Sequence, residues 1–262
     1  MKIIVMKTLR MIGMAFVAVF LCMACNSDDE ETKPNGPGGD KTEKKLIKFE
    51  THNDIEHQVY TFSYDEENRV TTILVEGTTY NDPYHIEKII KVKWHTDSIN
   101  CTEVSRGEES KATFVLKNGL ITKNTTDYLE KPYYYTYNTS GQISAINYGI
   151  DNSYTYTFSW DNGKITRLYD GRFDDEIKFE YENKTCKGFF PLYSYLFFCE
   201  EEEFDFMEIT FAHPEILGLR NNNLPWKTED YRVDIWLYTL DEDGYVKDCR
   251  TSNEWHYSFE WE

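Results

Sequence analysis

The sequence predicts an all-β protein of antiparallel β-hairpin repeats that form an open barrel or a strongly curved sheet, with a short helical insertion near residues 189–226. Three observations support this prediction. Apolar and aromatic residues recur at every second position in many segments, as in strands with one buried face. Similar turns follow those segments at a regular spacing. One stretch late in the chain breaks the pattern.

The first 24 residues predict a lipoprotein signal peptide. Basic residues precede the apolar run 11–23, which is short for a transmembrane helix. Ala24 before Cys25 resembles the lipobox read by the lipoprotein signal peptidase, although Cys22 stands where leucine is usual. The resemblance implies cleavage after Ala24 and lipidation of Cys25, and several acyl chains on one residue give stable anchoring. The alternative is an ordinary cleaved signal with an incidental Cys25.

Residues 25–44 predict a flexible acidic tether behind the lipidated Cys25. Residues 28–31 are four consecutive acids, and residues 33–40 are rich in Pro and Gly without a large apolar side chain. Acids in this place resemble the export signal that sends Bacteroidetes lipoproteins to the outer face of the outer membrane. A disordered acidic linker is the plain alternative, and both can hold at once. We therefore expect a lipid-anchored outer-membrane protein that is exposed at the cell surface; the inner face of the outer membrane is the alternative location.

The charge balance excludes some classes of partner. The chain has 46 acidic and 28 basic residues, a net charge of −18, and loss of the three basic residues of the leader would take this to −21. Such a surface repels phosphates, so neither nucleic acid nor an anionic lipid surface is expected as a partner.

Residues 45–262 are long enough for a single β domain. Aromatic residues occupy every second position in residues 154–160 and again in residues 257–261. Residues 90–94 alternate apolar side chains with lysines. This period of two predicts strands with one buried and one solvated face.

The predicted turns repeat along the chain. Residues 64–70 and 137–143 share a layout in which Asp or Asn follows an apolar or aromatic residue, and Asn or Gly comes shortly before an apolar one; residues 160–165 and 240–246 follow it too. Gly and Asn tolerate the positive φ of a tight hairpin, and Asp and Asn side chains can bond the turn backbone. The closing residues are 21, 22, 22 and 20 positions apart: Ser98, Gly119, Gly141, Gly163 and Asn183. This period fits one hairpin per repeat.

The repeat stops between residues 189 and 226. The stretch contains four consecutive acids at 200–203. Further on, Pro214 and Gly218 predict a short helix, with Pro at its first position and Gly near its end. We expect a crossover insertion with one or two short helices that covers an open end or face of the sheet.

Together, the lipobox, the acidic tether, the aromatic-Asp-x-x-Gly-x-Ile/Val hairpins and the late insertion with residues 218–225 resemble one family. It is a family of Bacteroidetes lipoproteins whose domain is described only as porin-like and of unknown function. The resemblance covers most of residues 46–262 and implies an antiparallel open barrel or strongly curved sheet, with no activity. The hairpins also resemble YD-type repeats of toxin shells, which form longer and more regular arrays. A membrane-embedded barrel would alternate in the same way, but the lipid anchor, the final Glu262 and several short strands argue against it.

No motif predicts catalysis. The sequence has no nucleophile elbow, zinc-protease helix, phosphate loop or dinucleotide fingerprint, so we predict a protein that is not an enzyme and uses no cofactor. Residues 52–57 bring two His and two acids together, which we interpret as an exposed polar turn in preference to a metal site. The acidic segments 174–176 and 200–203 lack the alternating spacing of a calcium loop. We predict no metal site.

Four cysteines remain beyond the anchor, and outside the cytoplasm they could form two disulfides in three pairings. Pairing of Cys186 with Cys199 would close the start of the insertion. Buried free thiols are the alternative for all four residues: Cys101, Cys186, Cys199 and Cys249.

Most aromatic residues fall at alternating strand positions, where core packing explains them. Tyr80, Tyr84 and Trp226 fall outside the alternation, so we take them as candidate ligand-binding residues, because aromatic faces stack on sugar rings. A loop aromatic can equally serve as a lid on the core. Ser98, in a turn after an Asp, resembles the short acceptor at which Bacteroidetes attach O-linked glycans.

The predicted function is a non-catalytic cell-surface binding protein for a glycan or protein ligand, with a wet cleft lined by the aromatic candidates. One alternative is a structural or accessory subunit of an outer-membrane complex, whose open sheet edges pair with another chain or which shows an exposed apolar patch. A lipid carrier is the other alternative, and it predicts a dry apolar cavity beneath the insertion. The ligand, the partner and the oligomeric state are not readable from the sequence.

Overall fold

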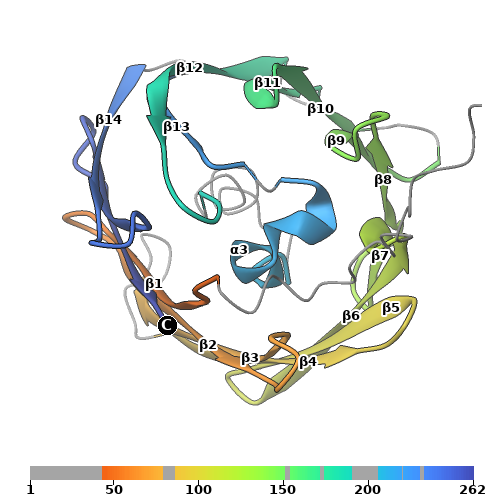
Figure 1. Ribbon diagram of the computed structural model, residues 1–262. Helices are drawn as coiled ribbons and strands as arrows, with labels where there is room; N and C mark the ends of the chain where they lie inside the picture. Colours follow the sequence, from red (N-terminus) through yellow and green to blue (C-terminus); the bar gives the residue numbers. More distant parts are fainter. Residues whose placement is uncertain are drawn as a thin grey trace, which may run out of the picture. The chain divides into compact units, whose positions relative to one another are not determined.

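The computed structural model describes residues 43–78, 86–150, 154–171, 174–190, 206–219, 221–230 and 233–262. In these residues, sixteen antiparallel strands form a closed barrel (Figure 1). The prediction of an all-β fold of antiparallel hairpins is confirmed. The expectation that the barrel would be open was wrong, because the strongly curved sheet closes where the first strand pairs with the last.

The strands follow one another around the barrel in chain order. They are β1 (Leu46–His52), β2 (His57–Tyr64), β3 (Val70–Thr78), β4 (Ile86–Trp94), β5 (Ser98–Ser105), β6 (Glu108–Lys117), β7 (Leu120–Thr126), β8 (Tyr133–Tyr137), β9 (Ile143–Tyr148), β10 (Tyr154–Asp161), β11 (Lys164–Asp170), β12 (Asp175–Thr185), β13 (Asn223–Glu229), β14 (Val233–Leu240), β15 (Val246–Thr251) and β16 (His256–Trp261). Two short helices lie between β12 and β13: α3 (Ile209–Ala212) and the 3₁₀ helix η1 (Pro214–Leu217).

The barrel closes at a seam between β1 and β16. Phe49 lies opposite Phe259, and Thr51 lies opposite Tyr257. Beyond the strands, Lys45 and Glu262 exchange backbone hydrogen bonds of 2.7 and 2.9 Å. The seam gives the backbone groups of both terminal strands a partner, so neither is left as a sheet edge.

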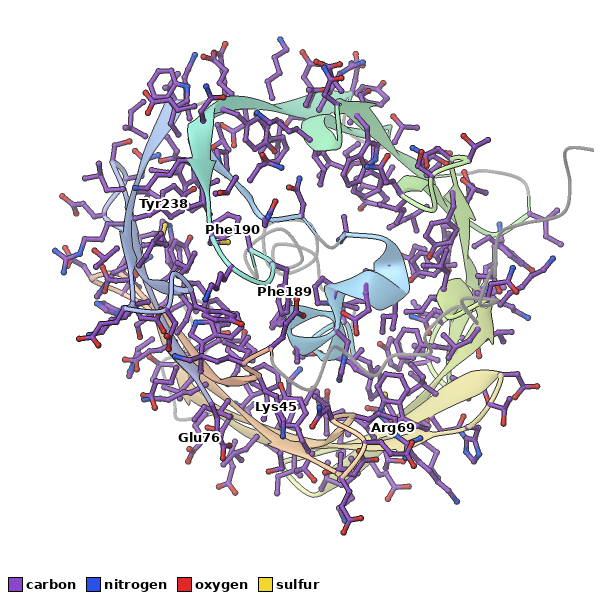
Figure 2. The ribbon with its side chains drawn as sticks, in the orientation of Figure 1. Lys45, Arg69, Glu76, Phe189, Phe190 and Tyr238 are labelled. Atoms are coloured by element: carbon purple, nitrogen blue, oxygen red, sulfur yellow. The ribbon has the colours of Figure 1, made fainter. Side chains whose placement is uncertain are left out.

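The inner face of the barrel is apolar and the outer face is polar. On β3, Ile73 and Val75 are buried, while Thr72 and Glu76 alternate with them on the other side. Figure 2 shows Glu76 outside the ring of strands and Phe190 within it. The apolar residues that recur at every second position in the sequence are therefore the side chains that form the core inside the barrel.

The insertion runs inside the barrel, where residues 206–219 lie within the ring of strands (Figure 1). We call residues 206–219 the plug. The short helix predicted from Pro214 is present as η1, and Gly218 ends it in the left-handed conformation. The plug packs on the inner face of the closed sheet. The predicted end of the insertion at residue 226 is too late, because β13 begins at Asn223.

The plug is almost entirely buried because it serves as the centre of the core. Its fully buried apolar side chains are Phe206, Met207, Ile209, Phe211, Ile216, Leu217 and Leu219.

The connections between strands fall at two ends of the barrel. We call one end the turn rim; it holds the connections 65–69, 95–97, 118–119, 138–142, 162–163 and 241–245. The opposite end is the loop rim, with the connections 53–56, 106–107, 127–132 and 252–255. The repeat of one hairpin therefore places its Asp/Asn–Gly turns at one end. Asn183 is an exception, because it lies inside β12 and closes no turn.

Candidate functional site: a plugged interior between two unlike rims

The turn rim repeats one five-residue turn. The first residue of the turn accepts two backbone N–H bonds through its side-chain oxygen Oδ1, at Asp65, Asn138 and Asp241. Three residues later the backbone takes a positive φ, at Asn68, Gly141 and Gly244. These turns confirm the predicted role of Asp and Asn side chains in the repeat.

Hydrogen bonding within the turns favours the ionised form of the aspartates. Partial burial opposes ionisation of Asp65, but bonds from the backbone and side chain of Arg69 outweigh it and lower the pKa. Burial likewise opposes ionisation of Asp241, whereas the Lys44 ammonium, 3.0 Å away, and the Tyr245 backbone lower its pKa. Lys44 also lies 2.6 Å from Asp243, so the start of the described chain is fixed to the turn rim.

Aromatic side chains ring the interior just inside the turn rim. The Tyr64 hydroxyl donates to the Leu46 carbonyl over 2.6 Å, and the Trp94 indole donates to the Val70 carbonyl over 2.8 Å. The same bond to the start of the preceding strand recurs at Tyr137, Trp160, Tyr181, Tyr238 and Trp261. We call these seven residues the aromatic collar. Each buries an aromatic body and satisfies its polar tip on the backbone, so the collar is core packing and not a sugar-binding platform.

The end of the plug next to the turn rim is fixed by His213 and Gly218. Val70 N–H donates to His213 Nε2 over 3.2 Å, and His213 Nδ1 lies 2.9 Å from Glu215 Oε1. This pair of bonds fits a neutral imidazole with its proton on Nδ1. Gly218 has a φ of 63°, and a Cβ added there would lie 2.2 Å from the Gly141 carbonyl oxygen. The plug backbone therefore touches the turn between β8 and β9.

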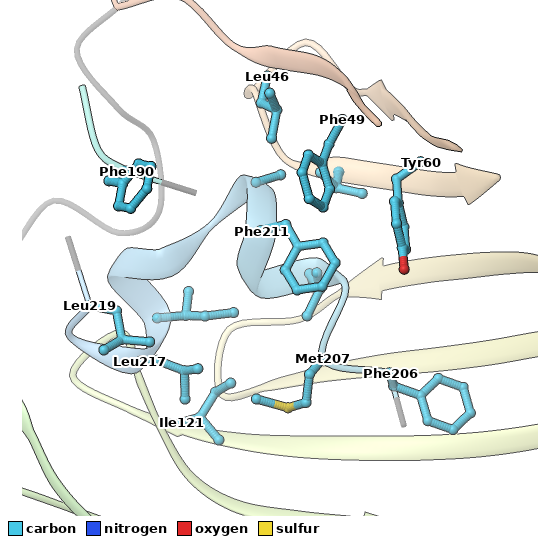
Figure 3. Packing of buried hydrophobic residues seen from close by; sticks show 14 of the residues in the cluster. Leu46, Phe49, Tyr60, Ile121, Phe190, Phe206, Met207, Phe211, Leu217 and Leu219 are labelled. Atoms are coloured by element: carbon cyan, nitrogen blue, oxygen red, sulfur yellow. The ribbon is translucent and has the colours of Figure 1, made fainter. Parts of the chain in front are cut away.

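The middle of the plug packs on aromatic rings of the barrel wall. Phe211 makes edge-to-face contacts with Phe49, at 5.9 Å between centroids, and with Tyr60, at 5.4 Å (Figure 3). The Tyr135 hydroxyl donates to Met207 Sδ over 3.9 Å. Such ring contacts add about 0.5–1.5 kcal/mol each to the burial of the rings.

A charged cluster connects the other end of the plug to β4 and β5. Lys88 Nζ lies 2.6 Å from Glu208 Oε1 and 3.2 Å from Glu103 Oε2, and all three side chains are at least four-fifths buried. Glu208 Oε2 is buried without a hydrogen-bond partner among the described residues. Two carboxylates thus share one ammonium in the interior, and removal of that ammonium would leave buried charge uncompensated.

The loop rim differs from the turn rim in its exposed apolar side chains. Ile55, Tyr128, Ile150 and Val233 lie at its connections and strand ends and are 63%, 45%, 86% and 49% exposed. Ile235 and Leu237 continue from Val233 along the outer face of β14. Among the described residues, the turns of the turn rim hold no exposed large apolar side chain.

The structure reaches only part of the predicted site. Ala24, Cys25, Tyr80 and Tyr84 lie outside the described residues, so lipidation and the tyrosine ligand site remain predictions. The ends of β3 and β4 that flank the two tyrosines lie at the loop rim.

Trp226 and Ser98 are described and do not come together. Trp226 was predicted in a loop, but it is the extra residue of a β-bulge in β13, opposite Glu180 and Tyr181, and is half-buried. Ser98 begins β5 at the turn rim, and its hydroxyl lies 3.4 Å from Asp97 Oδ1. These two strands stand far apart in the strand order.

The cysteines inside the barrel are inert thiols. Cys101, Cys186 and Cys249 are buried and free, so the bridge between Cys186 and Cys199 is not formed, and Cys199 lies outside the described residues. Burial raises the pKa of Cys186 to about 12 and raises the pKa of Cys101 and of Cys249 as well. A protonated, buried thiol is a poor nucleophile and a poor metal ligand.

Within the described part of the chain, no helix is both long and apolar enough to cross a membrane.

The fold is similar to that of two solved structures. One is a porin-like protein from Bacteroides uniformis ATCC 8492, with a TM-score of 0.62 and 18% identity over 83% of this chain and 96% of the other. The second is a porin-like protein from Bacteroides vulgatus ATCC 8482, with a TM-score of 0.56 and 13% identity over 84% of this chain and 99% of the other. No family model and no curated protein matches the sequence. At this identity the likeness shows the fold, in agreement with the porin-like part of the resemblance.

Proposed function

We propose that this protein is a non-catalytic binding protein of the outer membrane, lipid-anchored through Cys25, that presents its loop rim to a protein ligand. The contrast between the two rims carries the proposal. Lys44 pairs with Asp241 and Asp243 at the polar turn rim, so we expect the proposed tether to join the barrel at that end. The exposed apolar side chains gather at the opposite end, where a ligand would meet them.

The outer wall supports a barrel that stands outside the bilayer. A membrane-spanning barrel turns a continuous apolar band toward lipid. Here the outer wall carries ion pairs, in which Lys48 Nζ lies 3.3 Å from both Glu50 and Glu260, and Lys227 Nζ lies 2.7 Å from Glu180. The plug also occupies the interior along β1–β5, β7 and β8, so we propose binding at the rim in preference to conduction through the barrel.

An accessory subunit of an outer-membrane complex is the second candidate. The apolar strip of Val233, Ile235 and Leu237 on β14 favours it. Such a subunit would dock through its wall, because the closed seam leaves no strand edge to pair with another chain. The lipid-carrier alternative has less support, because plug side chains pack directly on the wall beneath the insertion.

The anchor can be tested separately from the ligand. Full-length protein with Cys25→Ser should lose labelling by a radioactive fatty acid and move from the detergent phase to the aqueous phase in a phase-partition assay. Labelling that persists in the variant would contradict lipidation at Cys25.

The binding surface can be tested with matched serine variants. The full-length protein and a loop-rim triple variant, Ile55→Ser with Tyr128→Ser and Ile150→Ser, would be screened against glycan arrays and envelope proteins of the source cell. Val115→Ser serves as the control, because Val115 is exposed on the outer wall of β6 near the turn rim, at the opposite end of the barrel from the loop rim. Saturable binding to one protein that the triple variant loses and the control keeps supports the proposal. Equal binding by both variants, or binding of glycan alone, contradicts it.

A further inference from the structure

Three histidines form a row on the outer wall at the seam. The strand register places His52 of β1 directly opposite His256 of β16 on one side and His57 of β2 on the other. Directly opposed residues of antiparallel strands have Cα atoms about 4.5–5.5 Å apart. The sequence showed only His52 and His57 near each other, whereas His256 comes 204 residues later and arrives through closure of the barrel.

Two of the ring nitrogens point at each other. His52 Nε2 and His256 Nδ1 are 3.0 Å apart, with the rings nearly perpendicular. The other nitrogen of His256 bonds a carboxylate oxygen of Asp248, so it carries the proton of that ring. In the neutral ring the Nδ1 lone pair of His256 therefore faces His52 and accepts a hydrogen bond from the Nε2–H of His52. A bound cation would take the place of that proton between the two nitrogens.

The surroundings keep this pair ready to bind a cation. Neutral imidazole is the form that binds a metal ion. Asp248 stands behind His256 as carboxylates commonly stand behind metal-bound histidines. The other charged groups on this face are paired with one another. Arg250 lies 3.5 Å from Asp248, Lys48 lies 3.3 Å from both Glu50 and Glu260, and His57 Nε2 lies 2.9 Å from Glu50 Oε1.

We propose that His52 and His256 form a two-imidazole site for a divalent transition metal such as Zn²⁺, with Asp248 as the positioning residue. Two imidazoles bound at 2.0–2.1 Å to one tetrahedral ion have nitrogens roughly 3.3 Å apart, so the 3.0 Å pair needs to open by only a few tenths of an ångström. Imidazole suits Zn²⁺, Cu²⁺ and Ni²⁺, and does not suit Mg²⁺ or Ca²⁺. In the described residues no three His, Cys, Asp or Glu side chains are grouped as metal ligands, so water completes the coordination.

A bound ion would join the first strand to the last. His52 and His256 belong to β1 and β16, the two strands whose pairing closes the barrel. An ion that binds only the closed barrel stabilises it by mass action, in proportion to the logarithm of its concentration above Kd. The inference therefore predicts that Zn²⁺ raises the melting temperature through this seam.

The test uses untagged full-length protein in detergent at pH 7.5, titrated with Zn²⁺ by equilibrium dialysis and by thermal melting. We expect one saturable equivalent, a raised melting temperature, and no response to Mg²⁺. Asp248→Asn should weaken Zn²⁺ binding about tenfold, and His52→Ala and His256→Ala by at least as much. His95→Ala at the turn rim and His57→Ala beside the pair are the matched controls and should bind as the wild type does.

Circular dichroism of each variant checks that the barrel still forms. Zn²⁺ uptake that is equal in the wild type, His52→Ala and His256→Ala overturns the proposal. Loss of uptake in His57→Ala alone, or no saturable uptake by the folded wild type, overturns it as well.

Discussion

The two ends of this barrel differ in their turns and in the side chains that they expose. At the turn rim, three of the six short connections between described strands share one five-residue design with a side-chain-bonded Asp or Asn, and the aromatic collar lies beneath the rim. The connections of the loop rim range from residues 106–107 to residues 127–132, and exposed apolar side chains stand at its edge. The comparison shows that the sequence repeat encodes the turns of the turn rim, which stabilise the fold. The loop rim lies outside that repeat and can therefore carry a ligand-binding surface.

The largest effect is expected where the plug touches the turn rim. Gly218→Ala should lower the free energy of unfolding by about 3 kcal/mol, because its Cβ would lie 2.2 Å from the backbone oxygen of Gly141 and the residue has a positive φ. Urea denaturation measures the change.

Gly119→Ala is the matched control for this substitution. Gly119 has a φ of 77° at the same rim, but nothing lies within 4 Å of an added Cβ, so only the backbone term of about 1 kcal/mol should remain. Equal losses in the two variants would mean that the plug does not press on the turn rim.

Next in size is the charged cluster at the other end of the plug. Lys88→Met leaves the carboxylates of Glu103 and Glu208 in the interior without their ammonium and should cost about 2 kcal/mol at pH 7. Adding Glu208→Gln should restore part of the loss, since one buried charge is then removed. Lys91→Met on the exposed side of the same strand should change stability by less than about 0.5 kcal/mol. Equal losses of stability in Lys91→Met and Lys88→Met, measured by thermal denaturation, would show that the charged cluster does not stabilise the fold.

A smaller effect is expected at the turn rim, where the contribution of Asp241 to stability depends on pH. The folded-state pKa of Asp241 lies below its ordinary value, so its contribution is present above about pH 3.9 and is lost as the pH falls through the folded pKa. Asp241→Asn keeps an oxygen acceptor for the turn, as Asn138 shows, but removes this titration. The stability advantage of the wild type over Asp241→Asn should therefore shrink on acidification below pH 4 in parallel urea melts. A constant difference from pH 7 to pH 3 would contradict the prediction.

The smallest effect is expected at the loop rim. Ile150→Ser removes a side chain that is 86% exposed, so stability should change by less than about 0.5 kcal/mol. A loss above 1 kcal/mol by thermal melting would show that Ile150 packs on the barrel and is unavailable to a ligand.

Local patterns predicted the hairpins well. The alternation of residues 154–160 reports β10, and the turn residues Asp65, Asn138 and Asp241 behave as their chemistry requires. Closure was not predicted, because the pairing of β1 with β16 depends on the curvature that sixteen twisted strands accumulate, and no local window carries that signal. The position of Trp226 was missed for a related reason: a bulge looks like a loop in sequence.

Much of the candidate site could not be predicted from local sequence patterns either. His256 and Asp248 meet His52 only through the seam, and Lys88 meets Glu208 only because the insertion turns inward. The collar is partly different, since at three of its seven members an aromatic residue stands immediately before Asp or Asn in the repeat: Tyr64, Tyr137 and Trp160. The hydrogen bonds to the preceding strand were the missing step, and the recurring pair could have marked these three.

The seam also determines the order in which the protein can fold. Of the sixteen strand pairings, fifteen join strands that are consecutive in the chain, and one joins β1 to β16. Most of the consecutive pairings close short loops and form early; the pairing of β12 with β13 spans the insertion. The pairing of β1 with β16 must wait for the C-terminal strand and pays the entropy of the longest loop. Because the plug precedes β13 in the chain, it must settle on the wall formed by β1–β8 before β14–β16 enclose it. Until β16 arrives, β1 presents an unpaired edge on which a second, equally unfinished chain can add a strand, so the final hairpin separates a closed barrel from an aggregate.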